Sequence, residues 1–77
     1  MDIRRVFSDN LKKYRNKTGL SQEAFAENAA LHRTYISAVE CGRRSISLDN
    51  IKKIADALNI PVYRLFIDEN EVVGGNM

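Results

Sequence analysis

Apolar residues recur along this chain at helical spacing. Ile3, Phe7, Leu11 and Tyr14 follow one another at intervals of three or four residues, which places them on one face of a helix. Gly19 is expected to end that helix, because glycine readily adopts the left-handed conformation in which helices commonly stop. The sequence has no sustained apolar–polar alternation and no Asn-Gly or Asp-Gly turn, which are the signals of strands and hairpins. The pattern therefore predicts an all-α fold.

Capping and turn residues divide the rest of the chain into four more helices. Ser21 and Ser47 suit N-cap positions, since their side chains can accept hydrogen bonds from the first free amides of a helix. Asn59 suits the end of the fourth helix, and Pro61 suits the first turn of the fifth. The third helix is expected over about residues 32–41. The expected apolar faces are Phe25, Ala26 and Ala29 in the second helix, Ile36 and Val39 in the third, and Leu48, Ile51, Ile54, Ala55 and Leu58 in the fourth. The fifth, short helix is expected to contain Val62, Leu65 and Phe66.

These helices are expected to form one compact five-helix domain over residues 1–67, followed by a flexible tail over residues 68–77. So short a chain buries only about 60% of its unfolded surface, so association into a homodimer would add stability. The C-terminal region also has more apolar residues than two short helices are expected to bury: Leu58, Ile60, Val62, Tyr63, Leu65 and Phe66.

Basic and acidic residues are unevenly distributed. Residues 1–53 contain 11 Lys and Arg against 6 Asp and Glu, a balance of +5, whereas residues 54–77 contain 1 basic against 4 acidic residues, a balance of −3. These balances give the net charge of +2. The distribution favours contact between the first part and a polyanion, with the acidic end turned away. A chance scatter of charges in a small protein is the alternative.

The composition argues against several classes of protein. Cys41 is the single cysteine and cannot form a disulfide within the chain, and one His with one Cys cannot complete a structural zinc site, so no metal or cofactor is expected. No apolar run approaches the roughly 18 residues of a membrane span, and no signal peptide is recognisable, which favours the cytoplasm and no membrane partner. Because no nucleophile–base pair, carboxylate dyad or glycine-rich phosphate loop is present, an enzyme is not expected.

The spacing between the second and third helices predicts that they cross at a steep angle. Ala26 must be small because the third helix crosses closest there, and Ile36 and Val39 anchor that helix on the core. The opposite face of the third helix has no core position and consists of His32, Arg33, Thr34, Ser37 and Ala38. A helix that is held by its inner face and has a polar outer face can enter the major groove of double-stranded DNA.

Three segments carry a resemblance to a known family: Leu20-Ser21-Gln22-Glu23 through Ala26, Arg33-Thr34-Tyr35-Ile36-Ser37, and Glu40-Cys41-Gly42. In this order they resemble the Xre/Cro/lambda-repressor class of helix-turn-helix regulators, over roughly residues 6–66. Residues 31–37 are especially similar to the controller proteins of bacterial restriction–modification systems. Ala30 departs from the glycine that many of these proteins have in the turn, and it is expected to carry modest strain.

The resemblance implies a lambda-repressor-like fold and a sequence-specific transcription regulator. As a controller protein, the chain would bind a near-palindromic operator as a dimer and would both activate and repress. A phage-type repressor or an antitoxin regulator is an alternative within the same class. A protein-interaction module that keeps the fold without binding DNA is the alternative from another class.

The resemblance also implies roles for individual residues toward DNA. Base-reading positions are matched by Arg33, Thr34 and Ser37, and positions that contact phosphates, sugars or adjacent bases are matched by Gln22, Tyr35 and Arg44. The forked guanidinium of Arg33 suits this role, since it can donate two hydrogen bonds to guanine O6 and N7. Arg43 and Arg44 follow the recognition helix and can clamp the flanking backbone. The alternative to DNA contact is that these arginines are solvated surface residues and that Tyr35 lies partly in the core.

Other roles follow from the same resemblance. Arg15 and Glu40 match a buried ion pair that ties the first helix to the third. Glu23 and Glu27 match an acidic patch that contacts the sigma subunit of RNA polymerase, although they could simply be solvated charges near a helix start. The two-fold interface of the family corresponds to Leu58, Ile60, Val62, Tyr63 and Phe66.

Overall fold

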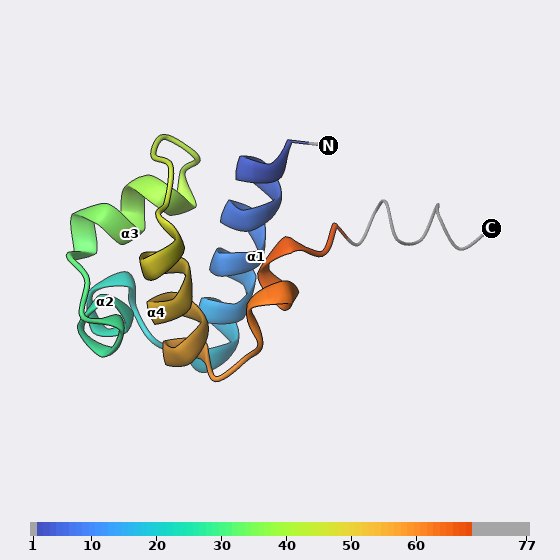
Figure 1. The fold of residues 1–77 in the computed structure, drawn as a ribbon. Helices are drawn as coiled ribbons and strands as arrows, with labels where there is room; N and C mark the ends of the chain where they lie inside the picture. Colours follow the sequence, from blue (N-terminus) through green and yellow to red (C-terminus); the bar gives the residue numbers. More distant parts are fainter. Residues whose placement is uncertain (1, 69–77) are drawn as a thin grey trace.

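The computed structural model describes residues 2–68 of the chain. Within this range the chain forms four α-helices and one short 3₁₀ helix, joined by short connections (Figure 1). The helices are α1 (Ile3–Thr18), α2 (Gln22–Ala29), α3 (Arg33–Glu40), α4 (Leu48–Leu58) and the 3₁₀ helix η1 (Val62–Phe66). No strand occurs within residues 2–68, which confirms the all-α prediction. The tail predicted over residues 68–77 lies, beyond Asp68, outside the described residues.

The ends of the helices are set by the residues that the sequence indicated. Ser21 Oγ accepts a hydrogen bond from the Ala24 amide at 3.1 Å and caps α2, and Ser47 caps α4 in the same way. Gly19 ends α1 with a φ of 78°, and Asn59 ends α4 with a φ of 58°. These local interactions confirm the predicted boundaries of α1, α2 and α4.

The turn between α2 and α3 contains Ala30 in the left-handed conformation, with a φ of 57° and a ψ of 43°. The Cβ of an L-residue makes this conformation cost about 1–2 kcal/mol relative to the right-handed helix. The Ala30 amide nevertheless bonds to the carbonyl of Glu27, and the following amide bonds to that of Ala26. The turn therefore keeps the hydrogen bonds that end α2 while its backbone carries the expected strain.

A single apolar core joins all five elements. Its largest fully buried side chains come from α1, α2, α3, α4 and η1 alike: Phe25, Leu11, Ile36, Ile54, Leu65 and Val39. Figure 1 shows η1 beside α1, where the ring of Phe66 packs against that of Phe7 with centroids 5.3 Å apart. Because α2 and α3 are only eight residues each, they depend on this packing to remain helical.

Two expected core positions and the type of the last helix differ from the prediction. Ile3 and Leu48 are 53% and 84% exposed, because each is the first residue of its helix and lies before the point where that helix reaches the core. The fifth helix is a 3₁₀ helix, in which the amide of Arg64 bonds to the carbonyl of Pro61 three residues earlier. Pro61 itself is the N-cap residue that precedes the helix.

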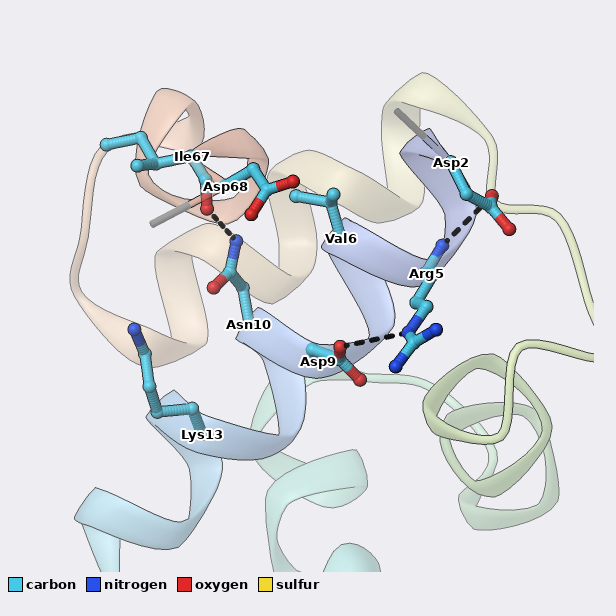
Figure 2. A pocket seen from close by; sticks show the side chains of 8 residues that line it. All are labelled: Asp2, Arg5, Val6, Asp9, Asn10, Lys13, Ile67 and Asp68. Atoms are coloured by element: carbon cyan, nitrogen blue, oxygen red, sulfur yellow. Dashed lines mark hydrogen bonds and ion pairs between the residues drawn. The ribbon is translucent and has the colours of Figure 1, made fainter. Parts of the chain in front are cut away.

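The segment after η1 is attached to the outer side of α1 by one buried amide. Asn10 Nδ2 donates hydrogen bonds to the carbonyls of Leu65 and Ile67, at 3.0 and 2.9 Å. Figure 2 shows the bond from Asn10 to Ile67 in a hollow along α1, where Arg5 also pairs with Asp9 at 3.6 Å. The hollow is lined by side chains of both charges and marks the joint between α1 and the C-terminal segment.

No helix within residues 2–68 has the length and apolarity to cross a membrane.

Candidate nucleic-acid interface

Helix α3 packs against the core of the domain through its inner face. Ile36 and Val39 are fully buried, while Arg33 and Thr34 are exposed and Ser37 is half-buried. The predicted inner face and the exposed start of the outer face are therefore confirmed, whereas Ser37 and Ala38 on the predicted outer face are half-buried. The helix begins after His32 and ends at Cys41, so the predicted span of residues 32–41 includes its two capping residues.

The carboxylate of Glu40 joins the first three helices. Arg15 on α1 donates from Nε to one carboxylate oxygen at 2.6 Å and from Nη2 to the other at 3.0 Å. Gln22 on α2 donates from Nε2 to the second oxygen at 2.9 Å. The Glu40 side chain is only 1% exposed, so these bonds compensate for the loss of its hydration. The hydrogen bond to Glu40 raises the pKa of Arg15 above its ordinary value.

Arg15 also fixes the turn between α1 and α2. Its Nη1 donates to the carbonyl of Leu20 at 2.9 Å, in addition to its two bonds with Glu40. One guanidinium thus connects α1, the following turn and α3, which is the arrangement that the resemblance implied for Arg15 and Glu40. Gln22 uses one of its two amide N–H groups for Glu40, and a primary amide has a second N–H to offer.

The start of α2 and the start of α3 enclose a shallow hollow that brings together several of the expected DNA-facing residues. It is lined by Ser21, Gln22, Glu23, Arg33, Thr34 and Ser37. Across it Arg33 Nη1 lies 3.7 Å from Glu23 Oε2, with both side chains about two-thirds exposed. Such exposed ion pairs contribute about 0–1 kcal/mol, so Arg33 is not committed to this carboxylate.

The connection between α3 and α4 contributes two basic residues in addition to Arg33 of α3. Arg43 and Arg44 are exposed, and the guanidinium carbon of Arg44 lies 5.3 Å from the centroid of the Tyr35 ring. Arg4, from the start of α1, donates to Ser45 Oγ at 3.3 Å. The connection is therefore tied both to α3 and to α1.

Two residues of this region were missed by the sequence analysis. Asn50 on α4 donates from Nδ2 to the hydroxyl of Tyr35 at 3.1 Å, and Arg4 bonds to the connection as described above. Neither residue belongs to a motif, and the partners are 15 and 41 positions apart in the chain. The tertiary fold brings each pair together, and no local spacing in the sequence does so.

The residues expected at a dimer interface divide between core and surface. Leu58 is buried within this chain, so its expected place at an interface is wrong. Leu65 is buried as well. Ile60 and Phe66 are half-buried against the core. Val62 and Tyr63 are 37% and 61% exposed and are the large apolar side chains that η1 presents to solvent.

The expected activation residues also differ from each other. Glu23 and Glu27 are both exposed and lie one turn apart on α2. Glu23 faces Arg33, whereas Glu27 forms no ion pair with any residue in the described part of the chain. Of the two carboxylates, Glu27 is therefore the more available to a partner.

Comparisons with known proteins agree with this architecture. The sequence pattern of the helix-turn-helix family matches residues 11–65. The control protein C.MunI from a Mycoplasma species is 48% identical over 68 residues, which cover 87% of this chain and 92% of that protein.

Two solved structures are also similar. The hypothetical transcription factor NHTF from Neisseria has a TM-score of 0.87 at 41% identity, covering 95% of this chain and 84% of that one. The restriction-modification controller protein C.AhdI from Aeromonas hydrophila has a TM-score of 0.79 at 43% identity, covering 82% of this chain and 96% of that one. Both likenesses extend over most of the described residues.

Removal of the Glu40 carboxylate is expected to destabilise the fold strongly. Glu40→Ala leaves the half-buried Arg15 guanidinium without its carboxylate partner, at a cost of up to about 3–5 kcal/mol in the free energy of unfolding measured by urea denaturation. Glu40→Gln keeps an acceptor oxygen and should lose less. Asp56→Ala is the control, because the ion pair of Asp56 with Lys52 is exposed and its removal should change the free energy by about 1 kcal/mol or less. Equal small losses for Glu40→Ala and Asp56→Ala would show that the buried pair is not structural.

Proposed function

The chain belongs to the helix-turn-helix family of DNA-binding transcription regulators, and we propose that within this family it is the controller protein of a restriction–modification system. The similarity to C.MunI and C.AhdI over most of each chain supports this proposal. The DNA-binding part rests on the outer face of α3, where Arg33 and Thr34 are exposed and polar and Ser37 is half-buried, with none of the three in the apolar core. Neighbouring genes for a methyltransferase and an endonuclease would be the expected genomic setting.

In this proposal α3 enters the major groove of the operator. Arg33, Thr34 and Ser37 read bases, with Arg33 donating two hydrogen bonds to a guanine and the Thr34 methyl group suited to thymine. The contacts that position the helix go to the sugar–phosphate backbone and adjacent bases, from Gln22, Tyr35, Arg43 and Arg44. The hollow shared by Gln22 and Arg33, and the contact of Arg44 with the Tyr35 ring, support this grouping.

The protein is proposed to bind as a homodimer through η1. Val62 and Tyr63 supply the exposed apolar surface, and Ile60 and Phe66 lie at its edge. A two-fold arrangement would place the two recognition helices about 34 Å apart, one turn of B-DNA, and so require a near-palindromic operator. The excess of acidic residues after residue 53 suits this end of the molecule to a position away from DNA.

The alternative of a protein-interaction module has less support. Such a module would present an apolar patch on the free face of α3. The large apolar side chains exposed among the described residues are Ile3, Leu48, Val62 and Tyr63, and none of them lies on α3.

A contact of α2 with the sigma subunit of RNA polymerase is proposed for activation. Glu23 and Glu27 form the acidic surface, with Glu27 as its main residue because Glu23 lies beside Arg33. A partner bound at Glu27 would lie next to the recognition helix, since Glu27 and Arg33 both line a second hollow, which also includes Leu31 and His32.

Arg33→Ala is expected to relax base preference at one position of each half-site. The loss of a bidentate contact should weaken binding to the preferred site by about 1–3 kcal/mol, while sites that lack the guanine lose little. Fluorescence anisotropy with operator duplexes changed one base pair at a time measures this. Arg43→Ala is the matched control and should weaken binding to every duplex alike, with the log–log salt slope reduced by about 0.9. A uniform loss for Arg33→Ala would make Arg33 a phosphate contact and contradict its assigned role.

Glu27→Lys is expected to abolish activation while leaving operator affinity intact, because it reverses the charge of the proposed polymerase contact. Transcription in vitro from the operator–promoter, with operator binding measured in parallel, separates the two effects. Asp56→Lys makes the same change of charge on α4 and should retain activation. If Glu27→Lys loses operator binding and activation together, α2 has no separate activation surface.

A further inference from the structure

The Tyr35 side chain is held on two sides by residues outside its own helix. Asn50 on α4 donates from Nδ2 to the Tyr35 hydroxyl at 3.1 Å, and the guanidinium carbon of Arg44 lies 5.3 Å from the ring centroid. Asn50 is itself fixed at the start of α4, where its backbone amide donates to Ser47 Oγ at 3.2 Å. One half-buried ring therefore links α3, the α3–α4 connection and the first turn of α4.

The direction of the Asn50–Tyr35 hydrogen bond leaves the phenol able to donate. A phenol has one proton to give and can also accept. Because the Asn50 amide is the donor, the Tyr35 proton is not used in this contact, and no residue in the described part of the chain accepts it. Phosphate oxygens only accept hydrogen bonds, so a phosphate at this surface matches the unused proton.

The face of the same ring positions Arg44. Arg44 is an exposed side chain in a connection without regular structure, and such a side chain loses conformational freedom when it binds DNA. Contact with the ring restricts the guanidinium before DNA arrives. The ring can do this only while it keeps its own orientation, and Asn50 is the residue outside α3 that bonds to its hydroxyl.

We propose that Asn50 is a positioning residue of the DNA interface, which orients the Tyr35 phenol toward a DNA phosphate and holds the ring beneath Arg44. This inference rests on the proposed docking of α3 against DNA. It assigns a role to α4, an element that has no base-reading residue in the proposed function.

A double-mutant cycle in the full chain, with operator duplex as the probe, tests the inference. Asn50→Ala should weaken operator binding about 5-fold, the effect of one typical hydrogen bond, and Tyr35→Phe should weaken it by a similar factor. In the Tyr35→Phe background, Asn50→Ala should cause less than about a two-fold further loss, because its partner hydroxyl is already absent. A full further loss in that background would show that Asn50 contacts DNA itself or only supports the fold, and would overturn the proposal.

The contact between Arg44 and the Tyr35 ring can also be measured in the absence of DNA. In nuclear magnetic resonance spectra of the free chain, the Arg44 side-chain protons should be shifted upfield by the Tyr35 ring. Asn50→Ala should reduce that shift, and Asp49→Ala, at the neighbouring exposed position of α4, should not. An unchanged Arg44 shift in Asn50→Ala would contradict the positioning role.

The two proposals fail in distinguishable ways. If the wild-type chain binds operator specifically and Asn50→Ala binds equally well, the inference about Asn50 fails and the proposed function stands. If the wild-type chain shows no preference for any operator over unrelated DNA, the proposed function fails and the role of Asn50 at the DNA interface fails with it.

Discussion

The buried carboxylate of Glu40 is the constraint on which the rest of the structure depends. A carboxylate removed from water is tolerated only when charged and polar groups replace its hydration, and here Arg15 and Gln22 do so from two other helices. The geometry of those bonds restricts how α1, α2 and α3 can be arranged. An eight-residue helix such as α3 has little stability of its own, so its orientation must come from these bonds and from Ile36 and Val39 beneath it.

This arrangement gives the two faces of one short helix different roles. One face packs on the domain, and the other is available for the proposed contacts with bases. The inner side of α3 packs on the core and bonds through Glu40 to Arg15 and Gln22. Arg33 and Thr34, at the exposed start of the helix, have no place in the core. Gln22 belongs to both sides, since one amide N–H bonds to Glu40 while its helix start faces the same hollow as Arg33. The contacts of Tyr35 with Asn50 and Arg44 extend the same principle to the connection after α3, because groups that face outward are oriented by partners behind them.

The sequence predicted the elements well because their ends are determined locally. Gly19, Ser21, Ser47 and Asn59 act through their own backbone conformation or through amides a few residues away, and such interactions can be recognised without the fold. The exposure of Ile3 and Leu48 could not be predicted in this way, because helical spacing does not show where along its length a helix meets the core.

Tertiary contacts were harder to predict than helix ends. The sequence favours an interface position for Leu58, because apolar spacing does not show how many side chains a tertiary core can hold, and the fold buries that side chain within the chain. Arg15 and Glu40 were found only because a family resemblance links positions 25 residues apart. No such resemblance pointed to Asn50, whose contact with Tyr35 arises from the packing of α4 beside α3.

In the proposed complex, two copies of α3 read the major groove of one operator. Methylation interference at guanine N7 on a selected operator tests this docking, because a methyl group there blocks major-groove contacts and leaves the phosphates unchanged. Two symmetry-related groups of interfering guanines are expected, with centres about one helical turn of 10–10.5 base pairs apart. Interference from phosphate modification alone, or a single group of guanines, would show that two copies of α3 do not read this groove.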